Sequence, residues 1–180
     1  MKRKDTSIEG CYEVFPLDLR DHRGRFVKPF HKDDFKDAGL DLDIREEYYS
    51  VSKKNVLRGL HFQLPPKATV KVVTCLSGSI FDAVVDLRTD SPTYLKYFTV
   101  ELTEEKGNLL FIPEGLAHGF CTLSNEATVL YMCSEVYSQQ HDTGLNWGSA
   151  RIPWPVKNPI VSEKDNGLME LNHFDSPFRL

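Results

Sequence analysis

The sequence predicts an all-β domain, a sandwich or barrel, with a few short helices. Five short segments rich in β-branched and aromatic residues recur at near-regular spacing: residues 70–76, 80–87, 97–102, 108–112 and 128–134. Turn-forming residues separate them, at positions 77–78, 89–92, 106–107, 113–115 and 124–125. Short strands divided in this way are typical of β-sandwiches and barrels. A chain of 180 residues has room for a real core, and we expect one domain over residues 1–180.

The first predicted helix covers residues 32–38 and ends at Gly39, a residue that often terminates helices. A second short helix is expected in the tail from Ser162 onward.

The segment at residues 57–63, LRGLHFQ, reads as a strand that carries Arg58 and His61 among apolar residues. Burying a cation and a histidine is costly without a partner or ligand. The two residues are three apart, so a regular strand would point them to opposite faces. Gly59 between them would permit a bulge that turns both to one side. This segment is therefore a candidate functional strand.

Two later strands also carry polar groups on an apolar face. Period-two alternation places Lys71 with Val73 and Cys75, and places Tyr131 with Val129 and Cys133. A lysine inside an apolar barrel is costly without an anionic partner, so Lys71 is a second candidate.

Composition excludes several classes of protein. The formal net charge is −4, whereas a nucleic-acid-binding protein needs a basic face. The basic N-terminus has no apolar stretch behind it, which argues against a signal peptide, and no apolar run approaches membrane-spanning length. The four cysteines lack CxxC spacing, so we expect reduced thiols in a cytoplasmic protein.

The spacing of Gly107, Pro113, Gly115 and His118 matches the second half of the cupin pattern, which belongs to a double-sheet jelly roll. The first half of that pattern should supply two histidines and a carboxylate for a metal. Here the corresponding region offers only His61, and a histidine-rich site needs at least three converging ligands. The sequence therefore predicts a cupin-type double-stranded jelly roll with no metal and no cofactor.

Four motifs occur together, in order: DHRGRF at 21–26, LRGLHFQ at 57–63, IPEGLAHGF at 112–120, which we expect to form a tight apolar turn, and SEKD at 162–165. Over about residues 21 to 165 the chain resembles the nucleotide-sugar 3,5-epimerases of the dTDP-4-dehydrorhamnose type. The resemblance implies a metal-free jelly roll, usually dimeric. It implies inversion of C3, C5 or both in a nucleotide-linked 4-keto-6-deoxyhexose, for deoxysugar units of surface polysaccharide.

Inversion beside a ketone requires a base, a group that holds the enolate oxygen, and an acid on the other face. The base should have a pKa near neutrality, and histidine is the side chain whose usual pKa meets that requirement. The resemblance assigns His61 as the base, Asp165 as the carboxylate that orients it, Lys71 as the group at the enolate oxygen, and Tyr131 as the proton donor.

The resemblance also implies a substrate-binding set. Arg23 and Arg58 would contact the pyrophosphate, since guanidinium groups suit phosphate oxygens. Tyr137 would stack on the nucleotide base, and His118 and Lys164 would lie at or behind the substrate.

Some recognition positions depart from the family. Lys28 stands where a glutamate is common, Glu46 and Tyr48 where Gln-x-Asn is common, Thr69 where a glutamine is common, and Asp142 where a glutamate is common. Because the implied catalytic set is intact, chemistry is expected to be retained. The nucleotide stays open among dTDP, CDP and GDP.

Three alternatives remain. The first is a single-carbon epimerase acting on a CDP- or GDP-linked 4-keto sugar. The second is a non-catalytic cupin-like sugar-binding module, which the presence of His61 and Tyr131 disfavours. The third is a metal-dependent cupin dioxygenase, disfavoured by the missing HxH. The expected partners are a nucleotide-diphosphate sugar and a second copy of the chain, since jelly rolls leave sheet edges that need covering.

Overall fold

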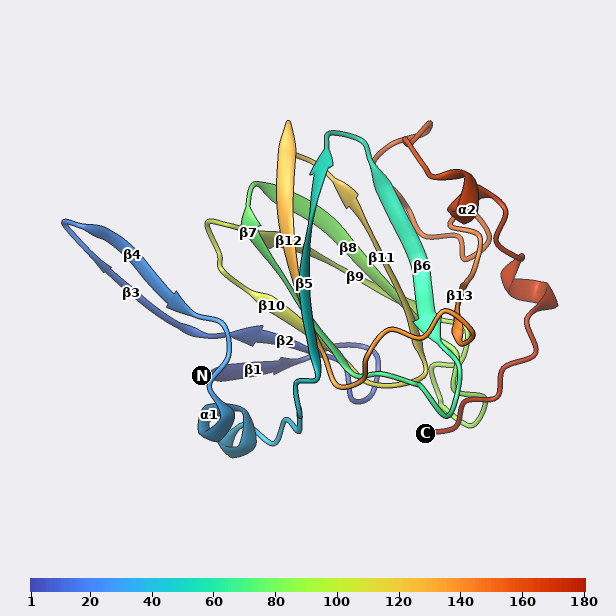
Figure 1. The fold of residues 1–180 in the computed structure, drawn as a ribbon, viewed down its shortest axis with the longest axis horizontal. Coiled ribbons are helices and arrows are strands. Elements are labelled where there is room, and N and C mark those ends of the chain that lie inside the picture. The colour runs from blue at the N-terminus through green and yellow to red at the C-terminus, as the bar shows by residue number, and fades with distance from the viewer.

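Two β-sheets lie face to face in the computed structural model, which describes residues 1–180, and a separate hairpin projects from them (Figure 1). One sheet has six strands in the order β1-β2-β10-β7-β12-β5, and the other has five in the order β13-β6-β11-β8-β9. Strands β3 and β4 form the hairpin. This double-sheet arrangement confirms the predicted all-β jelly roll.

The six-stranded sheet and the hairpin are formed by β1 (Lys2–Asp5), β2 (Tyr12–Phe15), β3 (Leu17–Asp21), β4 (Gly24–Lys28), β5 (Glu46–Lys53), β7 (Lys71–Ser77), β10 (Leu109–Ile112) and β12 (Glu126–Cys133). The five-stranded sheet is formed by β6 (Leu57–Gln63), β8 (Ser79–Asp86), β9 (Tyr97–Thr103), β11 (Leu116–Thr122) and β13 (Asp142–Gly144). The helical elements are α1 (Lys32–Asp37), α2 (Glu163–Asn166) and the 3-10 turn η1 (Leu171–His173). They are too short and polar to cross a lipid bilayer.

The five predicted strands correspond to β7, β8, β9, β10 and β12 with small shifts at their ends, and both predicted helices are present. The expectation for residues 112–120 was partly wrong. The turn ends at Gly115, which has φ of +82°, and the rest of the motif forms β11. His118 is therefore a strand residue held by pairing on both sides, to β6 and to β8.

The main core lies between the two sheets. Val73 of β7 and Val129 of β12 pack in one apolar cluster with Val84 of β8 and Phe120 of β11. A second cluster covers the outer face of the five-stranded sheet with the C-terminal segment, and a third covers the outer face of the six-stranded sheet with the segment around α1. The sheets are thus held rigidly on both faces, which fixes the cavity between them.

Strand β6 bulges where the sequence predicts. Across the β6–β11 pair, His118 faces His61 and Phe120 faces Arg58, so three steps on β6 oppose two on β11. Gly59 has φ of +125°, and a Cβ there would lie 2.5 Å from the Cα of Gly119. Only glycine fits both conditions. The bulge brings Arg58 and His61 to the same cavity.

All four cysteines are buried and free. Cys75, Cys121 and Cys133 lie in strands, and Cys11 immediately precedes β2. Burial raises the pKa of the Cys11 thiol to about 12, which is consistent with structural residues of low reactivity.

Candidate active site

A cavity of about 320 Å³ opens between the two sheets. Nine of the twelve residues predicted from the sequence line it: Tyr48, Arg58, His61, Lys71, His118, Tyr131, Tyr137, Asp142 and Lys164. A tenth, Asp165, binds His61 directly. Residues from β5, β6, β7, β11, β12 and β13 and from α2 therefore converge on one place.

His61 is held by Asp165. Its Nε2 lies 2.7 Å from one carboxylate oxygen of Asp165, and the backbone N–H of Gly59 donates to the other oxygen at 3.1 Å. The Ser162 hydroxyl caps α2 by accepting the backbone N–H of Asp165, which fixes the carboxylate behind the imidazole. Burial acts to raise the pKa of Asp165, but these hydrogen bonds outweigh it and hold that pKa below its usual value. Because Nε2 is engaged, Nδ1 is the ring nitrogen left for proton transfer.

Lys71 is the first residue of β7 and points into the cavity. Its Nζ donates a hydrogen bond of 3.3 Å to the backbone carbonyl of His61. Burial lowers the pKa of Lys71, while nearby Cys133, Asp142 and Asp82 act in the opposite direction. An ammonium in such a half-buried position interacts more strongly with a developing negative charge than one in open solvent does.

Tyr131 lies on β12, in the sheet that faces His61. Its ring stacks on Tyr48, its cross-strand neighbour, at 4.7 Å between centroids and 16° between planes. The edge of His118 packs against the same ring at 6.1 Å. Burial, then the neighbouring Tyr48 and Asp82, raise the pKa of Tyr131 well above its usual value, so the hydroxyl carries its proton at neutral pH.

The base candidate and the acid candidate therefore come from opposite sheets. His61 belongs to β6 of the five-stranded sheet, and Tyr131 belongs to β12 of the six-stranded sheet. A flat group placed between them can lose a proton on one face and gain one on the other.

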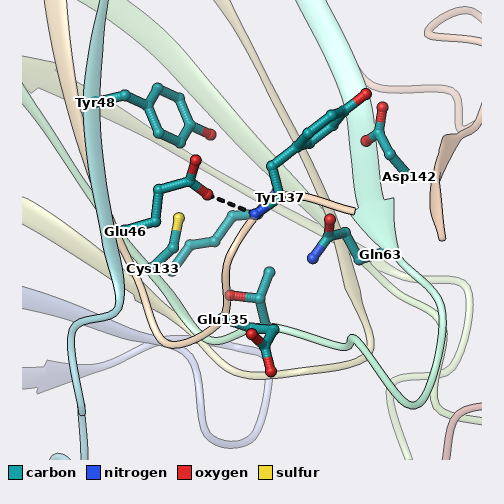
Figure 2. Close-up of a pocket in the computed structure, with 9 residues that line it drawn as sticks. Glu46, Tyr48, Gln63, Cys133, Glu135, Tyr137 and Asp142 are labelled. Carbon is teal, nitrogen blue, oxygen red and sulfur yellow. Dashed lines mark hydrogen bonds between the residues drawn. The ribbon is translucent and has the colours of Figure 1, made fainter. Parts of the chain in front are cut away.

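An adjoining cavity of about 270 Å³ shares Tyr48, Lys71, Tyr137 and Asp142 with the first. Figure 2 shows Tyr137 between Tyr48 and Asp142, with its backbone N–H donated to Glu46 at 2.8 Å. The Tyr137 side chain is exposed, which suits a surface for stacking. Lys164 pairs with Asp142, and that hydrogen bond raises the pKa of Lys164.

Four of the five departures from the family pattern gather in this adjoining cavity. Glu46, Tyr48, Thr69 and Asp142 line it, although they come from three separate stretches of the chain, whereas Lys28 does not. Sequence alone did not indicate that these positions form one wall.

Arg23 and Lys28 do not reach the cavity within one chain. Both lie on the β3–β4 hairpin, which projects away from the two sheets (Figure 1). The Arg23 guanidinium forms an ion pair with Asp21 beside it. Their predicted role in substrate binding would require a second copy of the chain.

Sequence reasoning missed two groups near the cavity. Ser50 of β5 lines it, with a buried hydroxyl that has no hydrogen-bond partner. Asp82 of β8 is fully buried and lies 2.8 Å from Nε2 of His118. The sequence does contain an indication of Asp82: by period-two alternation its carboxylate shares a strand face with the apolar residues Ile80 and Val84.

The chain is similar to known proteins over most of its length. The family model for dTDP-4-dehydrorhamnose 3,5-epimerase matches residues 5–173. The dTDP-4-dehydrorhamnose 3,5-epimerase of Shigella flexneri is 45% identical over 163 residues, which cover 89% of this chain and 90% of that protein.

Two solved structures are similar throughout. The epimerase of Bacillus anthracis with TDP and PPi bound has a TM-score of 0.92 and 37% identity, covering 94% of this chain and 99% of that one. The Legionella pneumophila dTDP-6-deoxy-D-glucose-3,5-epimerase in complex with dTDP-4-keto-L-rhamnose has a TM-score of 0.94 and 31% identity, covering 99% and 98%.

Proposed function

Because this chain belongs to the dTDP-4-dehydrorhamnose 3,5-epimerase family, we propose that it inverts the carbons beside the ketone of dTDP-4-dehydro-6-deoxyglucose through an enolate. The chain is an isomerase of deoxysugar biosynthesis. The observation that carries the proposed mechanism is the placement of His61 and Tyr131 on facing sheets, with Lys71 at the same cavity.

In this mechanism Nδ1 of His61 removes the proton from the carbon next to the ketone, and the Asp165 carboxylate stabilises the imidazolium that forms. The electrons of the broken C–H bond move to the ketone oxygen, where the Lys71 ammonium stabilises the enolate. Tyr131 then donates its hydroxyl proton to the opposite face of the same carbon. Solvent restores the proton of Tyr131 and removes that of His61.

The base assignment is tested by His61→Asn in heavy water. We expect incorporation of deuterium beside the ketone to fall at least about a hundredfold, as for loss of a general base. His173→Asn is the matched control, because His173 is exposed in the 3-10 turn η1 and outside the cavity. Exchange at the wild-type rate in the His61 variant would reject His61 as the base.

The proposed active unit is a homodimer in which each hairpin completes the partner's site. The hairpin exposes Leu19 and Phe26 at 55% and 56% of their surface, and an isolated two-stranded ribbon is marginal in water. A second copy could cover this apolar surface and use Arg23 for the pyrophosphate.

A complementation experiment tests that arrangement. Arg23→Ala and His61→Asn proteins are each expected to be nearly inactive, and mixed dimers should regain activity because one of their two sites has both residues. Sedimentation at micromolar concentration should give a dimer. No gain on mixing, or a monomer, would contradict the shared site.

The proposed nucleotide is dTDP, as in the similar solved structures. Tyr137 would stack on the base, and the wall formed by Glu46, Tyr48, Thr69 and Asp142 would contact the base or sugar. Competition among dTDP, CDP and GDP for the wild-type protein measures the preference. A CDP or GDP preference of more than about tenfold, roughly 1.4 kcal/mol, would reject dTDP.

A further inference from the structure

Behind the cavity wall lies a second carboxylate–imidazole pair that the mechanism above does not use. Asp82 is fully buried in β8, and one of its oxygens lies 2.8 Å from Nε2 of His118. Its other oxygen has no hydrogen-bond partner. A buried carboxylate oxygen without a hydrogen-bond partner lowers the stability of the folded protein. Asp82 lies in a strand that otherwise faces an apolar core, so this cost indicates a functional role for its carboxylate.

His118, the partner of Asp82, lies at the cavity itself. His118 is the direct cross-strand partner of His61 on β11, and it lines the cavity while Asp82 does not. Asp82 engages Nε2 of His118, and Nδ1 of His118 makes no hydrogen bond within the chain. Nδ1 is therefore the ring nitrogen available to a bound substrate. Hydrogen bonding at one ring nitrogen fixes the tautomer and orientation of an imidazole.

Asp82 also acts on Lys71 across the core. Burial lowers the pKa of Lys71 and raises that of Asp82, and the attraction between the two opposite charges opposes both shifts. Other groups face Lys71 as well: Glu46 and Tyr48 from β5, Cys133 from β12 and Asp142 from β13. Three other carboxylates line the adjoining cavity with Lys71, and each has a partner: Glu46 accepts the backbone N–H of Tyr137, Asp142 is paired with Lys164, and Glu135 is paired with Lys67. Asp82, in contrast, keeps one unpaired oxygen.

We propose that Asp82 is a positioning residue for the epimerisation: it fixes the imidazole of His118 with Nδ1 as a hydrogen-bond acceptor toward the substrate, and its charge favours an ammonium at Lys71, the group assigned to the enolate oxygen. This inference rests on the proposed function. Asp82 itself touches no substrate; it acts through His118 and Lys71.

The test is Asp82→Asn, which keeps the shape and an oxygen acceptor for His118 but removes the charge. We expect kcat to fall about 10- to 100-fold, the usual effect of losing a group that orients a functional side chain, with KM changed less than about threefold. The alkaline limb of the pH–rate profile should move to lower pH, because Lys71 loses its proton more readily without the nearby charge.

Asp86→Asn is the matched control. Asp86 is equally buried on the same strand, but it is paired with Arg88, Ser91 and Thr93 and lies outside the cavity lining. It should lower thermal stability without moving the alkaline limb. A shift of the limb in both variants, or in neither, would mean that Asp82 is only a structural residue.

A measurement on the wild-type protein covers the case in which Asp82→Asn fails to fold. Nitrogen-15 NMR of the histidine rings, assigned with His118→Gln, should show the neutral His118 ring with its proton on Nε2 and none on Nδ1. A ring protonated only at Nδ1 would overturn the proposal. Absence of epimerase activity in the wild-type protein would reject the proposed function instead, and the ring measurement does not depend on it.

Discussion

Replacing Asp165 by asparagine should disable the proposed base in a way that follows from the geometry. The two carboxylate oxygens of Asp165 serve two different donors, Nε2 of His61 at 2.7 Å and the backbone N–H of Gly59 at 3.1 Å. Asparagine has one acceptor oxygen and one NH₂ group, so it can satisfy only one of them. Either orientation of the amide brings an NH₂ group against one of these nitrogens.

If the amide NH₂ faces His61, Nε2 must become the acceptor and the proton moves to Nδ1, the atom proposed to take the substrate proton. If the amide NH₂ faces Gly59, the buried backbone N–H of Gly59 loses its acceptor, which lowers the free energy of unfolding by about 1–3 kcal/mol. We expect kcat to fall at least about a hundredfold and the free energy of unfolding to fall by about 1–3 kcal/mol.

Three measurements separate the effects of Asp165→Asn. NMR of deuterium incorporation reports on catalysis, calorimetry reports on dTDP binding, and urea unfolding reports on stability. Binding of dTDP should be retained, because Asp165 is buried behind His61 rather than at the cavity surface. Glu163→Gln, on the same short helix and exposed, is the control and should change none of them. A kcat within about threefold of wild type would refute the role of the Asp165–His61 pair.

The same residue predicts a dependence of stability on pH. The folded-state pKa of Asp165 lies below the ordinary value of 3.8 for an aspartate, so the contribution of Asp165 to stability is present above 3.8 and is lost as the pH falls through the folded pKa. The difference in unfolding free energy between wild type and Asp165→Asn should therefore shrink below about pH 4. A difference that grows on acidification would contradict this sign.

The remaining predictions concern the acid, the bulge and metals. Tyr131→Phe should allow exchange beside the ketone to persist while net inversion falls; equal loss of both would mean that Tyr131 has another role. Gly59→Ala should destabilise the fold by about 2–5 kcal/mol in urea unfolding, since alanine meets both a positive φ and the backbone of Gly119; a loss below about 1 kcal/mol would refute the close approach. Activity should survive a chelator, and a loss that a divalent ion restores would revive a metal-dependent reading.

The sequence by itself determined the fold class and most of the candidate site. Short runs of β-branched and aromatic residues, divided by turn residues, indicated the central strands. Alternation along two of them placed Lys71 and Tyr131 on apolar faces, and the glycine between Arg58 and His61 indicated the bulge that the β6–β11 pairing contains. These features depend on neighbours along the chain, so local sequence carries them.

Tertiary structure alone decided what meets across the barrel. It placed His61 and Tyr131 on opposite sheets, gathered four of the five departures from the family pattern around one small cavity, and joined Asp82 to His118. It also kept Arg23 and Lys28 on a hairpin away from that cavity. Contacts between residues far apart in sequence depend on strand order and register, which are set by how whole sheets bury their apolar faces, and no local pattern encodes them.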